Sequence, residues 1–353
     1  MIEKKNVSVA MSGGIDSAVA ALLALEQGYE VSGVTMKLCP KTDGNGTDLA
    51  QNDISDAKAV CDRIGIKHTV YDLEERFRDT VVKDFINTYV SGGTPNPCIV
   101  CNKLLKFGAL LDMEIARGAD YVATGHYARI EEKNGRYLLC KAADERKDQT
   151  YMLWSLSQYQ LSHTLFPLGS LTKPEIRRIG EDHGLVIAHK SDSQDICFVP
   201  DGDYASFIEN ARGEKFPEGD YIDENGNILG RHKGIIHYTI GQRKGLGISM
   251  GRHIFVAAKD AEKNTVTLAD EDKLFTNTVT IKGTNLIPFD KIEGKIRVKA
   301  KIRYHHTESD AYAEQTGTDE ITLTFDEPQR APAKGQSAVM YDGEYVVGGG
   351  IIQ

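Results

Sequence analysis

The sequence predicts an α/β protein in which a doubly wound parallel sheet is followed by a small β-rich middle domain and a C-terminal β-barrel. Short apolar runs alternate with helical segments over residues 1–200, which is typical of βαβ units. From Asn225 to Lys259 the chain is dense in glycine and has no Asp or Glu. Beyond Thr265, alternating segments and glycine turns indicate β-structure. We therefore expect domains at 1–200, 201–270 and 271–353.

Strands and helices of the first domain follow from hydrophobic periodicity and from turn residues. The expected strands are 7–11, 29–36, 66–73 and 121–124, with a hairpin over 129–141 around Asn134-Gly135. Helices are expected at 18–25, 53–64 and 74–90, from Asn102 onward, and after a capping box at Thr172. Polar or proline- and glycine-rich stretches predict loops at 42–52 and 91–101.

The stretch Ser12-Gly13-Gly14-Ile15-Asp16-Ser17 lies between the first strand and the first helix. Unpaired N–H groups at a helix N-terminus can hold an anion, and glycines allow a phosphate to approach closely. The stretch lacks the Gly-Lys-Ser/Thr ending of a Walker loop and the Gly-x-Gly-x-x-Gly of a dinucleotide fold. It resembles the pyrophosphate loop of ATP pyrophosphatases. Asp16 is placed to approach Mg²⁺ on phosphate oxygens, or to cap the helix.

The bulk composition predicts a cytoplasmic protein without a membrane span. The chain has 353 residues, is 41% hydrophobic and 26% charged, and has no apolar run near the length of a membrane helix. Residues 1–5 lead straight into the first strand, which leaves no room for a signal peptide. A formal net charge of −9 argues against a nucleic-acid partner unless basic residues gather on one face.

Three of the six cysteines are candidates for chemistry. Cys98 and Cys101 form a C-x-x-C pair, and Cys197 lies far along the chain, all in segments expected to be irregular. No second C-x-x-C is present, which disfavours a closed four-ligand zinc site. Because Cys101 precedes the helix expected at Asn102, we expect the helix dipole to lower its thiol pKa and favour a nucleophile.

A basic strand is the strongest sign of a nucleic-acid partner. Every odd position from Lys295 to Arg303 is Lys or Arg, and every even position from Ile296 to Tyr304 is apolar or aromatic. Alternation along a strand puts the five charges on one face. Ordinary solvated faces mix signs, so we expect this face, with the acid-free segment 225–259, to contact phosphates.

Taken together, the motifs resemble those of the bacterial tRNA-uridine 2-sulfurtransferase (2-thiouridylase, MnmA) family over essentially the whole chain. They are residues 10–17, Thr94-Pro95-Asn96-Pro97, Cys101-Asn102-Lys103, 123–127, 147–149, Ser193-Gln194-Asp195-Ile196-Cys197-Phe198, 239–247 and Arg303-Tyr304. The resemblance implies an adenine nucleotide alpha-hydrolase-like first domain. It also implies that the enzyme adenylates the C2 oxygen of uridine 34. Sulfur then displaces AMP to give 2-thiouridine in the tRNAs for Lys, Glu and Gln.

The resemblance also implies roles for particular residues. ATP, with Mg²⁺, would be bound by Ala10, Met11, Ser12, Gly13, Gly14, Ile15, Asp16 and Ser17, with Met36 and Gly125 near the adenosine. The target uridine would meet Asn96, Pro97 and Cys98, and the tRNA would meet His126, Lys147, Asp148, Gln149, Arg303, Tyr304 and Gln336. In the usual scheme Cys197 carries a persulfide received from a cysteine desulfurase or a sulfur-relay protein, and Cys101 is its partner nucleophile.

Cys98 departs from the pattern, because many family members carry Asp at this position. Cys98, Cys101 and Cys197 are therefore also a candidate ligand set for a [4Fe–4S] cluster whose open iron could bind hydrosulfide. The sequence leaves the persulfide and the cluster mechanisms open. Rival interpretations are an amidotransferase-type adenylating synthetase, a non-catalytic tRNA-binding protein and an iron–sulfur redox protein.

Overall fold

The computed structural model describes residues 4–39, 49–185 and 196–353. The chain divides into two compact units. Unit 1 comprises Met1–Val81, Cys98–Phe198 and Gly343–Val347, and unit 2 comprises Val82–Pro97, Val199–Asp342 and Gly348–Gln353. The division of the sequence into three domains stays a prediction.

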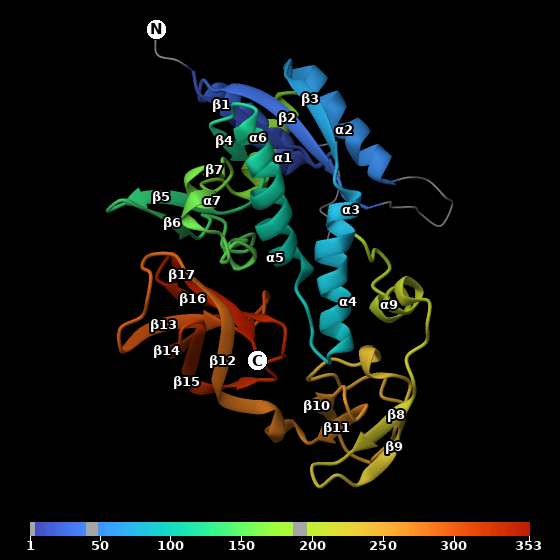
Figure 1. Cartoon of the computed structure of the whole chain (residues 1–353). Coiled ribbons are helices and arrows are strands. Elements are labelled where there is room, and N and C mark those ends of the chain that lie inside the picture. The colour runs from blue at the N-terminus through green and yellow to red at the C-terminus, as the bar shows by residue number, and fades with distance from the viewer. Residues whose placement is uncertain (1–3, 40–48, 186–195) are drawn as a thin grey trace. The chain divides into compact units, whose positions relative to one another are not determined.

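A five-stranded parallel sheet forms the centre of unit 1, in the order β3-β2-β1-β4-β7 (Figure 1). Its strands are β1 (Asn6–Ala10), β2 (Glu30–Lys37), β3 (Lys67–Asp72), β4 (Tyr121–Ala123) and β7 (Thr164–Leu165). The predicted parallel α/β sheet is confirmed. Since β1 is central in this order, the loop that follows it opens at the carboxyl edge of the sheet, where such folds bind ligands.

Helices cover both faces of this sheet. The β1 side chains Val7 and Val9 pack in one core with α1 (Ile15–Glu26), α2 (Leu49–Ile64) and α8 (Lys173–Asp182). The opposite face packs Val34 and Val122 against Leu110 and Leu111. The helical segments α3 (Glu74–Phe77), η1 (Arg78–Val82) and α4 (Lys83–Val90) confirm the helix predicted over 74–90. The doubly wound arrangement is thus confirmed.

The segment predicted as a loop over 91–101 is helical in its last five residues. Helix α5 (Pro97–Cys101) continues without a break into the π-helical stretch η2 (Asn102–Leu110) and α6 (Leu111–Ala116), drawn as one long helix in Figure 1. The expectation that a helix starts at Asn102 was wrong. Proline fits the first helical position, because its φ is already helical and its missing N–H would have no partner there.

The remaining elements of unit 1 lie after β4. The hairpin β5 (Arg129–Lys133) and β6 (Arg136–Cys140) is confirmed, and its turn residues Asn134 and Gly135 both have positive φ, 53° and 75°. Two positive φ angles are what a two-residue hairpin turn of this hand requires. The short helices η3 (Thr150–Met152) and α7 (Gln158–Ser162) follow.

Unit 2 contains a four-stranded sheet in the order β10-β11-β8-β9 and a closed barrel. The sheet consists of β8 (Gly219–Ile222), β9 (Ile228–His232), β10 (Phe255–Asp260) and β11 (Thr265–Ala269), with α9 (Tyr204–Arg212), η5 (Ile235–His237) and η6 (Glu271–Leu274) around it. The barrel order is β12-β15-β14-β13-β16-β17, and β17 pairs back with β12. Its strands are β12 (Phe275–Leu286), β13 (Lys295–Lys301), β14 (Ser309–Gly317), β15 (Glu320–Arg330), β16 (Ser337–Asp342) and β17 (Tyr345–Ile352). The predicted C-terminal β-barrel is confirmed.

Within residues 4–39, 49–185 and 196–353, none of the helices has both the length and the apolar character that crossing a bilayer would require.

Helix α8 begins at the predicted capping box, and this predicts a local stability effect. The Glu175 carboxylate accepts hydrogen bonds from the Thr172 N–H and hydroxyl, both at 2.7 Å. Replacing Thr172 with Ala removes the hydroxyl, and loss of such a cap costs about 1 kcal/mol. We expect amide hydrogen exchange in α8 to become about fivefold faster, measured by mass spectrometry. Unchanged exchange in α8 would contradict this role for the capping box.

Candidate functional site

The loop between β1 and α1 has the geometry of an anion cradle. Ser17 Oγ accepts from the Ser12 N–H at 3.1 Å and donates to the Gly14 carbonyl at 3.0 Å, which closes the loop on itself. Gly14 is the N-cap of α1, and no side chain in the described residues caps this helix. The first-turn N–H groups are therefore available to an anion. Asp16 does not cap the helix, so that predicted alternative was wrong.

Glycine is required on both sides of this loop by close backbone contacts. Gly13 has φ 73°, and a Cβ built on it would lie 2.5 Å from the Asp53 carbonyl oxygen. Gly125 follows β4, and a Cβ there would lie 2.8 Å from the backbone nitrogen of Ser17. The structure thus brings two separately predicted ATP-site segments, Gly125 and the loop, into direct contact. It places Ala10 at the end of β1 and Met36 in the apolar cluster around Val34.

The carboxylate of Asp16 is already paired. Lys173 Nζ lies 2.8 and 2.9 Å from its two oxygens, and the Tyr127 hydroxyl donates to it at 2.7 Å. The Lys173 side chain is only 7% exposed, so this ion pair is largely shielded from water. Pairing removes the repulsion that a bare carboxylate would exert on a phosphate in the loop.

From the sequence alone no role is predicted for Lys173 or Tyr127, although the position of Lys173 is itself informative. Lys173 is the first residue of α8, where a cation is disfavoured by the positive end of the helix dipole. A buried lysine at such a position indicates a specific anionic partner. The partner, Asp16, is 157 residues away, so no local pattern identifies it.

The three candidate thiols occur in the same unit and influence one another. Cys101 is 8% exposed, whereas Cys98 and Cys197 are exposed. Burial raises the pKa of Cys101 to about 12, and desolvation also raises the pKa of Cys98. The nearby Cys197 raises both, which places the three thiols within electrostatic range. The expectation of a lowered Cys101 pKa was wrong, because Cys101 ends α5 instead of preceding a helix and is buried.

Lys106 is a cation beside these thiols that the sequence did not single out. It lies half-buried on η2, and its positive charge lowers the pKa of Cys98 and Cys101, which partly offsets the increase caused by burial. The same charge, after burial, lowers the pKa of His126 well below its usual value, so the imidazole is neutral at pH 7. His126 packs between the rings of Phe107 and Phe166, and its Nδ1 is 2.7 Å from Thr124 Oγ1.

The thiols offer the right donor chemistry for iron but are not arranged as ligands. Thiolates are the usual ligands of iron–sulfur clusters. In the part of the chain that the structure describes, no group of three or more His, Cys, Asp or Glu side chains is placed to hold a metal ion.

Two of the residues expected to contact tRNA instead hold protein backbone. Asp148 is buried and accepts from the Ala142 N–H at 3.0 Å and the Thr150 hydroxyl at 2.6 Å. Gln149 Oε1 accepts from the Tyr127 N–H at 2.9 Å. Lys147 is half-buried beside them. This segment therefore supports Tyr127, which in turn contacts Asp16.

The predicted target-base residues lie at the start of α5, after a loop. Asn96 is half-buried and Pro97 is the buried first residue of the helix. Gln336, from the turn before β16, donates to the carbonyls of Thr94 and Pro95. The structure thus brings Gln336 to the segment that leads into Asn96.

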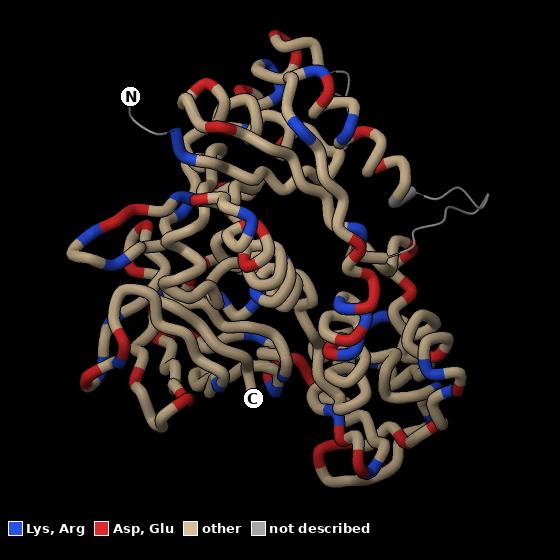
Figure 2. Tube along the Cα trace, turned by 45° about the horizontal axis from the view of Figure 1, so that its top comes forward, with Lys and Arg blue, Asp and Glu red and all other residues tan. Residues whose placement is uncertain are grey.

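The basic strand does not present one sign of charge. Asp310 and Asp326 pair with Arg297, and Lys295 pairs with Glu314 at 3.4 Å. Lys301 lies 3.9 Å from Glu308. The partners come from β14, from β15 and from the turn before β14. The expectation of a face with one sign of charge was wrong, because acidic side chains pair with three of its five basic residues. Figure 2 shows acidic and basic residues interspersed over the chain.

Beyond β13, Arg303 donates to the backbone carbonyls of Arg330 and Ala331 at 2.8 and 2.9 Å, and Tyr304 is half-buried. In the acid-free segment, Arg231 and Arg252 pair with Asp220 and Asp270. These two acidic residues lie outside the segment. Those contacts leave less free positive charge than the sequence suggested.

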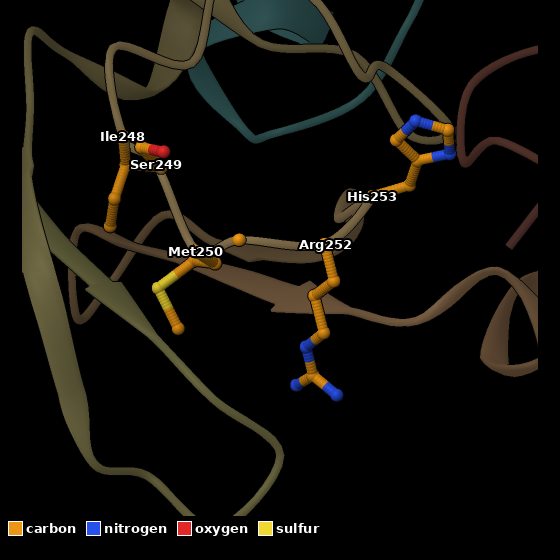
Figure 3. Close-up of a pocket in the computed structure, with 6 residues that line it drawn as sticks. Ile248, Ser249, Met250, Arg252 and His253 are labelled. Carbon is orange, nitrogen blue, oxygen red and sulfur yellow. The ribbon is translucent and has the colours of Figure 1, made fainter.

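Lys233, Arg243 and Lys244 are further exposed cations of the acid-free segment. A surface hollow of about 480 Å³ within this segment is lined by Ile248–His253 (Figure 3). None of the predicted site residues lines it. We therefore assign it no part in the site.

Substitution of Gly125 tests whether its contact with the loop matters. We expect Gly125→Ala to weaken ATP binding at least tenfold, because the new methyl group would displace the backbone at Asp16 and Ser17. Titration calorimetry measures this affinity. The control is Gly230→Ala, where the nearest atom is the end of the Ile248 side chain at 3.3 Å. Equal affinities in the two variants would contradict this role.

Thiol reactivity tests the environment of Cys101. On reduced, metal-free protein at pH 7, iodoacetamide should alkylate Cys101 at least about 100-fold more slowly than Cys197, because a thiol with a raised pKa is protonated and buried. The rate at Cys101 should rise about tenfold per pH unit toward pH 11, whereas an ordinary thiol levels off near its pKa of about 8.5. Peptide mass spectrometry reads each site. Comparable rates at pH 7 would refute the burial argument.

Comparisons with known proteins agree with this architecture. The family described as the tRNA methyl transferase HUP domain matches residues 5–201. Residues 205–270 match a tRNA methyl transferase PRC-barrel domain, and residues 276–352 match an aminomethyltransferase beta-barrel domain. The U34-tRNA thiolase NcsA of Methanococcus maripaludis with its [4Fe-4S] cluster covers 59% of this chain and 68% of its own at 19% identity and a TM-score of 0.38. That likeness is too weak to bear on chemistry.

Full-length relatives are much closer. The tRNA-specific 2-thiouridylase MnmA of Acetivibrio thermocellus is 47% identical over 359 aligned residues, which cover 100% of both chains. The tRNA-specific 2-thiouridylase MnmA 1 of Clostridium tetani is 49% identical, over 99% of this chain and 97% of that one. Identity at this level over whole chains, together with the loop and the thiols, establishes descent. The chain belongs to the tRNA-specific 2-thiouridylase family.

Proposed function

We propose that this protein is an ATP-dependent transferase that replaces the C2 oxygen of uridine 34 with sulfur in the tRNAs for Lys, Glu and Gln, releasing AMP and pyrophosphate. The observation that carries the proposal is the presence, in unit 1, of both an anion-ready loop and three neighbouring thiols. The loop is suited to bind the phosphates of ATP, and the thiols are suited to carry and transfer sulfur. The full-length relatives named for this activity support the substrate.

The loop residues bind and orient the triphosphate. The first-turn N–H groups of α1 face the phosphates, and Gly13 and Gly125 keep the backbone close enough for them to do so. Asp16 is the carboxylate placed to share a Mg²⁺ ion with phosphate oxygens, and Lys173 balances its charge. Bound Mg²⁺ would neutralise phosphate charge. The uridine O2 then attacks the α-phosphorus, the bond to the β-phosphate breaks, and pyrophosphate leaves.

Sulfur delivery uses the thiols. A persulfide on Cys197 attacks C2 of the adenylated base, and AMP leaves with the former O2. Cys101 then attacks the Sγ of Cys197, which breaks the sulfur–sulfur bond and leaves the outer sulfur on C2 as the thiocarbonyl. The two cysteines end as a disulfide, and a dithiol reductant restores them. Exposure of Cys197 suits it to receive sulfur from a protein donor, for which we propose a cysteine desulfurase or sulfur-relay protein.

The base must leave the anticodon stack to react, and buried polar atoms near the thiols are suited to receive it. Asn102 is 2% exposed and donates to the Met152 carbonyl at 3.0 Å. Its Oδ1 is buried and has no hydrogen-bond partner in the described part of the chain. An acceptor left in this state is costly unless a ligand N–H reaches it. The N3–H of uracil is a donor of this kind, and Asn102 directly follows Cys101.

A [4Fe–4S] cluster on Cys98, Cys101 and Cys197 is the alternative route, supported by the electrostatic proximity of the three thiols. If bound, such a cluster would supply an open iron for hydrosulfide. In the described part of the chain these side chains are not placed as a ligand set, so the reaction proposed above does not involve a cluster. Iron and sulfide analysis after anaerobic purification tests for the cluster. Activity of the variant Cys98→Ser is a second test, because only the persulfide route works without the Cys98 thiol.

We further propose that residues 1–200 form the ATP-cleaving domain and that residues 201–270 and 271–353 contact the tRNA in the cytoplasm. Exposed Lys233, Arg243 and Lys244 support a phosphate contact in the middle part. The basic residues of β13 support a phosphate contact less strongly than the sequence suggested, because acidic side chains pair with them.

The decisive test is modification of tRNA in vitro. The protein is incubated with ATP, Mg²⁺ and transcribed tRNA(Glu), anaerobically and in air. Sulfur is supplied by a cysteine desulfurase with L-cysteine and a dithiol reductant for the persulfide route, and by sulfide in a parallel reaction for the cluster route. Nucleosides are analysed by mass spectrometry. We expect 2-thiouridine in the parent. We expect a loss of at least 100-fold in Cys197→Ser, because a hydroxyl cannot carry the persulfide sulfur.

Matched controls isolate the chemistry. Cys61→Ser removes a buried thiol that packs in the core of unit 1, and it should retain activity if the protein folds. A tRNA with cytidine at the wobble position should remain unmodified. Absence of 2-thiouridine in the parent under both atmospheres would overturn the proposal.

A further inference from the structure

The loop that leads to the target-base residues is packed against a turn of unit 2 by glycines. We call Gly92–Pro97 the target-base loop. A Cβ on Gly93 would lie 3.2 Å from the Lys334 carbonyl oxygen, and a Cβ on Gly335 would lie 3.1 Å from the backbone nitrogen of Thr94. Gly335 also has φ 88°. Two backbones therefore meet at a distance that side chains on either would prevent.

Hydrogen bonds fix this contact. The Thr94 N–H donates to the Lys334 carbonyl at 2.7 Å, and the Gly93 N–H donates to the Thr88 carbonyl at 2.8 Å. Gln336 Nε2 donates to the carbonyls of Thr94 and Pro95 at 3.1 and 3.2 Å. From β10, Lys259 Nζ donates to the Tyr238 carbonyl at 2.8 Å and to the Gly93 carbonyl at 3.4 Å.

Gln336 is itself held rigidly. Its N–H donates to the Ala333 carbonyl at 3.1 Å, and its carbonyl accepts from the Ile352 N–H at 2.8 Å, which ties the residue to the last strand of the barrel. A side-chain amide has two N–H donors, and here both are directed at consecutive backbone carbonyls. The Nε2 of Gln336 is therefore engaged by protein backbone, and the tRNA contact implied for this residue stays a prediction.

We propose that Gln336 is a positioning residue that holds the target-base loop, so that Asn96 and Pro97 meet the uridine in a fixed conformation. This inference rests on the proposed function for its catalytic consequence, but the clamp itself exists without tRNA. The two carbonyls that Gln336 satisfies immediately precede Asn96. Misplacing a substrate-positioning segment by about 1 Å can reduce a rate about 100-fold.

The test compares variants at the turn. Gln336→Met keeps the side-chain length but removes both donors, and Gln336→Asn keeps the amide but is too short to reach. Gln336→Lys restores a donor that can bond two carbonyls, as Lys259 does nearby. The matched control is Lys334→Met, because the Lys334 side chain is exposed on the same turn and only its backbone carbonyl contacts the loop.

Three readouts are measured: hydrogen exchange of residues 91–97 in the tRNA-free protein, the single-turnover rate of thiolation, and the Kd for tRNA. For Gln336→Met and Gln336→Asn we expect exchange at least tenfold faster, thiolation at least tenfold slower, and a tRNA Kd within about twofold of the parent. Gln336→Lys should recover the protection from exchange. Lys334→Met should change neither exchange nor the thiolation rate at saturating tRNA.

Unchanged exchange in both Gln336→Met and Gln336→Asn would overturn the proposal. A second pattern would also overturn it: unchanged exchange together with a loss of tRNA affinity in these variants and in Lys334→Met. That pattern indicates a direct tRNA contact. If the parent gives no 2-thiouridine, the proposed function fails, and exchange alone still decides whether Gln336 clamps the loop. If Gln336→Met does not fold, Gln336→Asn carries the comparison.

Discussion

The ion pair between Asp16 and Lys173 is the interaction on which the candidate site depends most. The loop after β1 offers N–H groups to an anion, but an unpaired carboxylate in the first turn of α1 would oppose the binding of a phosphate. Lys173 neutralises that carboxylate from the first turn of α8, and Tyr127 fixes it with a hydrogen bond. Because Lys173 is almost fully buried, the pair also fixes the distance between α1 and α8 on one face of the sheet. The same contact therefore serves both packing and ligand binding.

A second constraint concerns the thiols, which differ in burial. Burial keeps Cys101 protonated in the free protein, while Lys106 acts in the opposite direction. A buried, protonated thiol reacts slowly with oxidants, because the thiolate is the reactive form. Cys197, which is exposed, has the complementary property and can meet a sulfur donor. The difference in burial between the two thiols thus suits a sulfur carrier and its resolving partner.

The parts of the fold that depend on local sequence were predictable. The strand–glycine–helix unit, the Asn134-Gly135 hairpin and the capping box at Thr172 each depend on neighbours a few residues apart. The parts that failed depend on distant partners. The partners of Arg297 lie on two other strands, so the pattern of β13 alone could not show that its charge is compensated. The start of α5 at Pro97 was not predicted, because two prolines and two glycines in one short stretch indicate a loop. Proline, however, also fits the first position of a helix. For Gln336, the family resemblance implied a tRNA contact, and only the structure shows that its amide contacts protein backbone.

The central claim is that the loop Ser12–Ser17 and the thiols serve one reaction, in which ATP is cleaved between its α and β phosphates to activate a tRNA base. Analysis of the nucleotide products tests this most directly. With ATP labelled at the α-phosphate, we expect AMP and pyrophosphate to form only when substrate tRNA is present, in a one-to-one ratio with 2-thiouridine under single-turnover conditions. Formation of ADP and phosphate, or of AMP at the same rate without tRNA, would contradict it.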